Sequence, residues 1–133
     1  WVKLGKNADQ DKLPKIFYVN WFRKDDNNDK LPGGFMWPGY GDNSRVLAWI
    51  FDRCNGKDNF VETAIGYVPK PEDIDLTDLD MDIDVLKSIL EVDKDIWTKE
   101  AEEIEEHYKK FGDRLPEELR EQLNNLKANL AKM

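Results

Sequence analysis

Hydrophobic and polar positions repeat along this chain with two periods, one typical of helices and one typical of strands. Residues 45–54 are almost continuously apolar, which predicts a helix capped by Ser44 and buried on most sides. Residues 15–22 are β-branched and aromatic, which predicts a buried strand. Residues 62–68 predict a second strand, because Pro69 ends the run.

The C-terminal third follows helical spacing. Residues 83–91 predict a short helix, Asp93 is the expected cap of a longer one, and Pro116 suits the first position of the last. The apolar stripes of the two long helices are Trp97, Ala101, Ile104, Tyr108 and Phe111, then Leu115, Leu119, Leu123, Leu126 and Leu130. A short joint at Gly112 makes them an αα-hairpin, so we expect an α+β fold, mainly helical, with a small sheet.

Two regions follow from this pattern within a single domain. Residues 1–71 form an aromatic strand, loop and helix region, and residues 72–133 form an acidic linker followed by the C-terminal helices. Residues 1–10 are typical of the last turns of a helix, and the chain opens on Trp1 where a translation start would carry Met. We therefore expect a fragment of a larger protein, whose exposed apolar surface favours self-association.

Composition narrows the possible partners. The 133 residues suit one domain, and the net charge of −8 disfavours nucleic acid and anionic membranes, which bind clustered Lys and Arg. Much of the acidity lies in residues 71–106, whereas residues 1–24 are on balance basic, so we expect any anion site in the N-terminal half. Cys54 is the single cysteine, which excludes an internal disulfide and fits a reducing compartment.

One acidic run resembles a calcium-binding loop. The residues at positions 1, 3, 5 and 12 of that template are Asp80, Asp82, Asp84 and Glu91. The template needs glycine at its sixth position, where this chain has Val85. A helix cap supplied by Asp82 or Asp84 explains the run without a metal, and we favour that interpretation.

Residues for self-contained catalysis are not apparent in the sequence. His107 is the only histidine and has no zinc-ligand partners at a suitable spacing, so a solvated position on a helix is favoured. Cys54 has no nearby histidine and is more typical of a small core residue. The motifs GxxxxGK[ST], GxSxG and HExxH do not occur. We therefore predict no catalytic residue and no metal ligand in this chain.

Aromatic residues gather in the segment before the first predicted helix. They are Phe17, Tyr18, Trp21, Phe22, Phe35, Trp37 and Tyr40. Phe17 and Trp37 fit the hydrophobic core, but Phe35 and Tyr40 flank a Pro-Gly turn. Such a loop suits a flat polar heterocycle, with rings stacked on its faces and Asn43 or nearby backbone groups hydrogen-bonded to its edge. A helix N-terminus beside it favours a negative charge.

Three segments carry a resemblance to a known family. They are IFYVNWFRK at 16–24, FMWPGYGDNSRVL at 35–47 and IGYVPK at 65–70. Together with the helical tail, they make the chain similar over nearly its whole length to the GTP-dependent phosphoenolpyruvate carboxykinases. That family converts oxaloacetate and GTP to phosphoenolpyruvate, carbon dioxide and GDP in gluconeogenesis, and is cytoplasmic. The resemblance places this chain in its larger C-terminal, nucleotide-binding domain.

The resemblance also implies a guanine-binding set. Its members here are Trp21, Phe22, Phe35, Tyr40, Gly41, Asp42 and Asn43. The stacking rings of the family fall on Phe22, Phe35 and Tyr40, and its guanine-contacting asparagine falls on Asn43. The family's phosphate-binding loop, its manganese and magnesium ligands and its oxaloacetate-binding arginines lie upstream of the matched region. The resemblance thus implies GTP or GDP as ligand, the missing N-terminal part as partner, and no activity of this chain alone.

Three positions depart from the family pattern. The link from Arg23 to Phe35 is longer than the usual short turn, which bears on how Phe35 approaches the base. Tyr40 replaces the common phenylalanine and adds a hydroxyl that needs a partner or water. Asp42 stands where glutamate is usual. The last two changes are conservative.

Two alternatives come from the residues themselves. In the first alternative the chain is a non-enzymatic interaction module, which binds a peptide through its aromatic, proline-containing face and the αα-hairpin. Binding of single-stranded nucleic acid through stacked rings is disfavoured by the net charge of −8.

Overall fold

The computed structural model describes residues 2–25 and 31–133, which divide into two compact units. We call one the hairpin unit; it contains Trp1–Leu13, Glu62–Gly66 and Val92–Met133. We call the other the aromatic unit; it contains Pro14–Val61 and Tyr67–Glu91. The sequence-based division at residue 71 stays a prediction. Residues 23–30 are all charged or polar, which is typical of a solvated turn, and residues 26–30 lie outside the described part of the chain.

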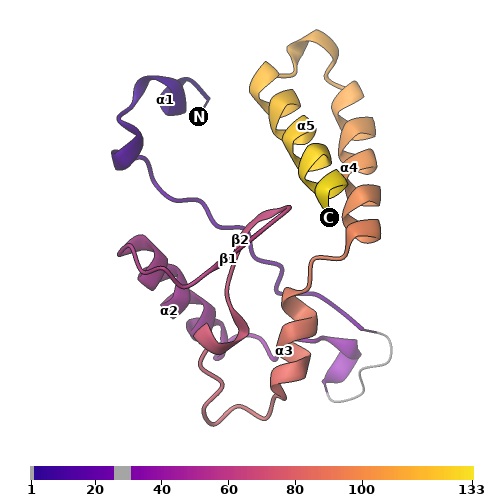
Figure 1. The fold of residues 1–133 in the computed structure, drawn as a ribbon. Helices are drawn as coiled ribbons and strands as arrows, with labels where there is room; N and C mark the ends of the chain where they lie inside the picture. Colours follow the sequence, from indigo (N-terminus) through magenta and orange to yellow (C-terminus); the bar gives the residue numbers. More distant parts are fainter. Residues whose placement is uncertain (1, 26–30) are drawn as a thin grey trace. The chain divides into compact units, whose positions relative to one another are not determined.

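The aromatic unit is built around α2 (Asn43–Cys54) and α3 (Ile83–Leu90), between which the chain forms a β-hairpin, one 3₁₀ turn and irregular segments (Figure 1). Its core consists of Trp37, Trp49, Ile74 and Leu86. Of the two expected candidates, Asp82 is the residue that caps α3, because its carboxylate accepts a hydrogen bond of 2.9 Å from the Asp84 amide. The acidic run therefore begins a helix.

The prediction that α2 is buried on most sides is wrong. Trp49 is its buried residue, whereas Leu47 and Phe51 are exposed. Cys54 is also exposed, so its assignment to the core is wrong as well. These three residues are four and three positions apart and share one helical face. An apolar helix is buried only where other elements cover it, and in the described residues α2 packs through the opposite side.

The predicted strand at residues 15–22 does not form. Exposure alternates along it, since Phe17 and Val19 are half-buried while Ile16 is 87% and Tyr18 is 91% exposed. Its period-two pattern therefore does select an inner face. A strand also needs a hydrogen-bonded neighbour, and the described residues supply none over this range. An isolated antiparallel bridge comes later, between Lys24 and Phe35.

The second predicted strand is a small hairpin. β1 (Val61–Thr63) and β2 (Gly66–Val68) form a two-stranded sheet with a tight turn between them. Gly66 has a φ of 120°, which other residues rarely adopt. The Thr63 hydroxyl fastens the turn by donating to the Gly66 carbonyl at 2.7 Å. Residues 62–68 thus contain a reversal that a continuous strand would lack.

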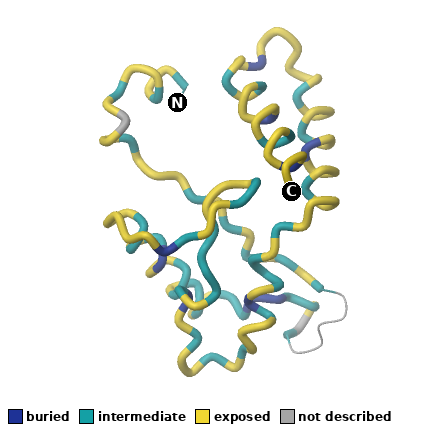
Figure 2. The backbone as a smooth tube through the Cα atoms, viewed as in Figure 1, coloured by how far each residue is buried: buried dark blue, intermediate teal, exposed yellow. Residues whose placement is uncertain are grey.

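The hairpin unit confirms the predicted αα-hairpin. α4 (Lys94–Lys109) packs against α5 (Glu117–Lys132), and the buried positions lie between them (Figure 2). Their core consists of Ala101, Leu123 and Leu130, with Trp97, Ile104, Tyr108 and Leu126 around it. Asp93 caps α4 as predicted, accepting from the Ile96 amide at 2.8 Å. Pro116 lies one position earlier than expected, at the N-cap of α5.

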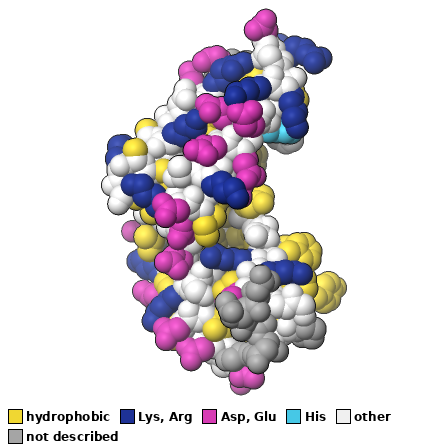
Figure 3. All heavy atoms as spheres, turned by 90° about the vertical axis from the view of Figure 1, so that its right-hand side faces the viewer, with side chains coloured by type: hydrophobic (Ala, Val, Ile, Leu, Met, Phe, Trp, Pro, Cys, Tyr) yellow, Lys and Arg dark blue, Asp and Glu magenta, His cyan; other side chains and the backbone are white. Residues whose placement is uncertain are grey.

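Ion pairs cover the surface of this unit. Glu105 and Lys127 join α4 to α5 at 2.8 Å, and the hydrogen bond and charge of Lys127 lower the pKa of Glu105. Lys6, at the end of α1 (Val2–Asn7), pairs with Glu118 of α5. α1 matches the helical end expected in residues 1–10. Acidic and basic side chains are intermixed on the face drawn in Figure 3.

The fold class is α+β, mainly helical, as the sequence predicts. In the part of the chain that the structure describes, no helix is long and apolar enough to cross a membrane.

Candidate functional site

The loop that leads into α2 is closed by its own backbone. Gly39 has a φ of 95°, and its carbonyl accepts from the amides of Asp42 at 2.9 Å and Asn43 at 3.2 Å. The helix consequently begins at Asn43, with Asp42 at the N-cap. The prediction that Ser44 caps the helix is wrong, because Ser44 is already inside it and its hydroxyl donates to the Gly41 carbonyl at 2.9 Å.

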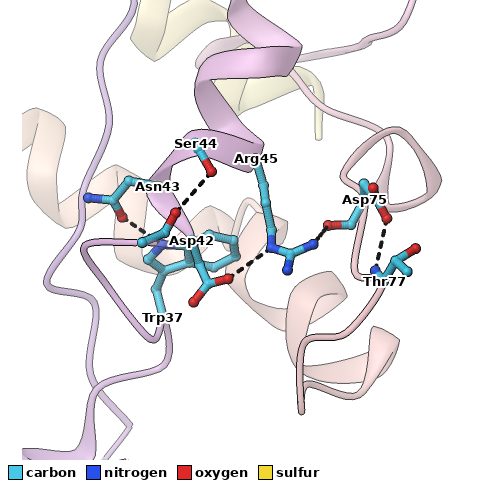
Figure 4. Close-up of polar contacts among 8 residues, drawn as sticks. Trp37, Asp42, Asn43, Ser44, Arg45, Asp75 and Thr77 are labelled. Carbon is cyan, nitrogen blue, oxygen red and sulfur yellow. Dashed lines mark hydrogen bonds and ion pairs between the residues drawn. The ribbon is translucent and has the colours of Figure 1, made fainter.

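Arg45 fixes this loop to a distant segment of the same unit (Figure 4). Its Nε lies 2.9 Å from Asp42 Oδ1, and its Nη1 donates to the Asp75 carbonyl at 2.6 Å. The Asp75 carboxylate accepts from the Thr77 amide at 2.8 Å, and hydrogen bonding to Thr77 lowers the pKa of Asp75. Asp42 is therefore engaged with Arg45, as a brace of the loop.

The indole of Trp37 holds the side chain of Asn43. Trp37 Nε1 donates to Asn43 Oδ1 at 2.9 Å, and Trp37 is 6% exposed in the core of the aromatic unit. The sequence predicts separate roles for them, Trp37 in the hydrophobic core and Asn43 in the binding site. The structure joins them, and their spacing carries no pattern that would have shown the contact in advance.

Two predicted stacking rings lie together. The centroids of Phe22 and Phe35 are 6.2 Å apart at 61°, an edge-to-face pair. The segments 23–25 and 34–36 hold them there by antiparallel hydrogen bonds, such as the 2.9 Å bond from the Met36 amide to the Arg23 carbonyl.

Lys24 is a component of the site that the sequence reasoning missed. Its Nζ lies 4.7 Å from the centroid of the Phe35 ring, close enough for a cation–π contact. Phe22 and Lys24 are both exposed and two residues apart, so the alternation along this segment places them on one side. That spacing is the signal that could have identified Lys24.

The remaining predicted residues lie in different environments. Trp21 packs against the core cluster and is only partly exposed, so it helps to hold the neighbouring surface residue Phe22 in place. Tyr40 is 97% exposed on the turn, and Gly41 beside it is exposed too. The structure thus pairs Phe22 with Phe35, and Asn43 with Trp37, and presents the Tyr40 ring to solvent.

The described residues contain no group of three or more His, Cys, Asp or Glu side chains that could hold a metal ion. The manganese and magnesium implied by the family resemblance therefore find no fitting ligand set here, and we assign none. His107 contacts the Phe111 ring, with centroids 5.3 Å apart, near the end of α4.

Comparison with known proteins adds to this geometry. The family described as phosphoenolpyruvate carboxykinase C-terminal P-loop domain matches residues 1–129. Proteins named phosphoenolpyruvate carboxykinase [GTP] are similar to the chain: 54% identical over 131 residues in Treponema pallidum strain Nichols, 52% over 130 in Renibacterium salmoninarum, and 44% over 131 in Neocallimastix frontalis. Each match covers 98% of this chain and 20%, 21% and 21% of the respective relative. The chain thus spans about a fifth of the length of these relatives.

Proposed function

The chain belongs to the family of phosphoenolpyruvate carboxykinase C-terminal P-loop domains, and from that premise we propose that two of its segments, residues 21–24 and 35–43, bind the guanine base of GTP. Two observations support this most directly: an aromatic ring pair and an oriented amide side chain, both on the segments that precede and begin α2. Phe22 and Phe35 form a ring pair beside Lys24, and Asn43 presents its amide at the start of α2.

Stacking supplies affinity in this proposal. Phe22 is 72% and Tyr40 is 97% exposed, and large rings at the surface gain free energy when a flat base covers them. Base–aromatic stacking contributes roughly 1–3 kcal/mol per base, with little preference among bases. The preference for guanine therefore falls to polar groups at the base edge, of which the Asn43 amide is the candidate on this loop.

Charge favours the nucleotide as well. Lys24 lies beside the ring pair, and the N-terminus of α2, at Asn43, is the positive end of the helix dipole. Both features suit an anionic ligand in a chain whose net charge is −8. This agrees with the basic balance of the first 24 residues.

The parent reaction is part of the same proposal. In this proposal the intact enzyme is a lyase that converts oxaloacetate and GTP to phosphoenolpyruvate, carbon dioxide and GDP, in gluconeogenesis in the cytoplasm. Manganese and magnesium would be held by ligands outside this chain, as would the triphosphate, and we assign no catalytic residue to it. Family membership favours this role over the non-enzymatic interaction module.

Kinetics of the intact enzyme test the proposal. Asn43→Ala should raise the KM for GTP by about 3- to 10-fold, the equivalent of one hydrogen bond, and leave the KM for oxaloacetate nearly unchanged. Asn55→Ala is the matched control, because Asn55 is an exposed asparagine just beyond the other end of α2. Equal increases in both KM values for Asn43→Ala would contradict a role in base binding.

A further inference from the structure

The hydrogen bond between Trp37 and Asn43 admits one orientation of the amide. An indole N–H donates and cannot accept, whereas a carboxamide has an accepting oxygen and a donating nitrogen. The oxygen must therefore face Trp37 Nε1, which lies 2.9 Å away. Figure 4 shows the consequence: the amide nitrogen of Asn43 points away from the indole.

Both partners of this bond are held in place. Trp37 is 6% exposed and belongs to the same core cluster as Trp49. The backbone of Asn43 is fixed by the Gly39 carbonyl and by the start of α2, and the adjacent Asp42 is braced by Arg45. Reversing the amide would bring its nitrogen against the indole and leave a buried N–H group without an acceptor, which is costly.

The amide nitrogen of Asn43, which faces away from Trp37, carries N–H groups that can donate to a ligand. Among the described residues it makes no hydrogen bond, while its neighbours are engaged: Asp42 with Arg45, and the Ser44 hydroxyl with the Gly41 carbonyl. The polar group that this part of the loop presents to a ligand is consequently an N–H donor from Asn43.

Purine bases differ at the position that such a donor can read. Guanine carries an accepting oxygen at C6, whereas adenine carries a donating amino group there. We infer that Trp37 is the positioning residue that sets this preference, because it keeps the Asn43 amide turned with its donor toward the base; this inference rests on the proposed guanine site. The oxygen of a 6-oxo purine accepts a hydrogen bond from the Asn43 amide. The amino group of a 6-amino purine is itself a donor and cannot accept one.

Trp37→Phe in the intact enzyme tests the inference, because it removes the N–H group and keeps an aromatic ring in the core. We expect the ratio of kcat/KM for GTP to that for ATP to fall by about tenfold, as the freed amide rotates. The two values should move in opposite directions, since the rotated amide offers its oxygen to the amino group of adenine. A general loosening of the fold would lower both together, and that result, or an unchanged ratio, would overturn the inference.

Trp49→Phe is the matched control. Trp49 is 5% exposed, lies in the same cluster, and donates from Nε1 to the Asn59 carbonyl at 2.7 Å. The substitution removes an equally buried indole N–H group that does not touch Asn43. We expect it to leave the ratio unchanged. A fall as large as that of Trp37→Phe would attribute the effect to core packing.

Two further variants complete the test. Replacement of Trp37 by β-(3-benzothienyl)alanine keeps the bicyclic shape and substitutes sulfur for N–H, so it must reproduce the altered ratio even if Trp37→Phe folds poorly. Asn43→Ala separates the two hypotheses. If Asn43→Ala leaves the ratio unchanged, the proposed guanine site is wrong. If it lowers the ratio while both Trp37 variants do not, the guanine site stands and only the role of Trp37 fails.

Discussion

The two units of this molecule solve the problem of buried polar groups in different ways. In the hairpin unit the core is Ala101, Leu123 and Leu130, and the two helices satisfy their own backbone groups. In the aromatic unit two of the four core residues are tryptophans, and both donate hydrogen bonds, Trp37 to the side chain of Asn43 at the start of α2 and Trp49 to the Asn59 backbone.

This difference explains where the candidate site lies. Regular helices leave few polar groups unpaired except at their ends, so an apolar stripe suffices to pack them. An irregular chain has to bond its loops through side chains, and those bonds fix the direction of other side chains nearby. The aromatic unit can therefore present an oriented amide and exposed rings, whereas the hairpin unit provides mainly packing.

The largest effect is expected from breaking one of the tryptophan bonds together with its packing. Trp49→Ala should lower the free energy of unfolding by about 3–5 kcal/mol, through a cavity and an unpaired Asn59 carbonyl. Leu130→Ala, at a 3% exposed position of the hairpin, should cost about 2–5 kcal/mol from the cavity alone. Chemical denaturation followed by circular dichroism measures both. A loss below about 1 kcal/mol for Trp49→Ala would contradict its place in the core.

A smaller effect distinguishes the two kinds of helix start. Asp93 caps α4 through its side chain, so Asp93→Ala should cost about 1 kcal/mol. Asp42 occupies the N-cap of α2 but makes no capping bond, so Asp42→Ala should cost less and act by releasing Arg45. Thermal unfolding compares them, and hydrogen exchange of the first turns of α4 and α2 locates the change. An equal loss in both would mean that Asp42 caps after all.

The smallest effect concerns acid. Hydrogen bonding to Thr77 lowers the pKa of Asp75 in the folded protein, so its charged form contributes stability above the ordinary carboxyl pKa. That contribution is lost as the pH falls below about 4, through the lowered folded pKa. Asp75→Asn should therefore flatten the acid limb of the stability curve, measured by denaturation at several pH values. Asp80→Asn is the control, because it removes an exposed carboxylate close to Asp75 in the sequence. The acid limb of this variant should stay as steep as that of the unmodified protein.

Much of the fold could be predicted because helical signals are local. The stripe from Trp97 to Tyr108, the caps Asp82 and Asp93, and the hairpin joint were all apparent, since side-chain direction in a helix repeats within a few residues. The same reasoning failed for residues 15–22 and for Cys54. Their composition indicates burial, but burial depends on whether another element covers them, and composition does not contain that information.

The candidate site shows the same limit. The residues of the proposed guanine set came from a family resemblance and from the clustering of rings, and family membership of the chain is confirmed. Their assignment to guanine stays a prediction. Lys24 escaped notice because its partner, Phe35, is reached only after the chain reverses.

By itself the sequence determined the helices, the polar and apolar faces of the C-terminal pair, the α+β class and the family, because these rest on local periodicity and on residue identity. Only the tertiary structure decided that GGFMWPGYGDNSR closes on itself, so that the Trp37 indole meets the Asn43 amide and the Arg45 guanidinium meets Asp42. The physical reason is that a hydrogen bond depends on direction as well as proximity. Direction is set by the loop and core together, after the chain has folded.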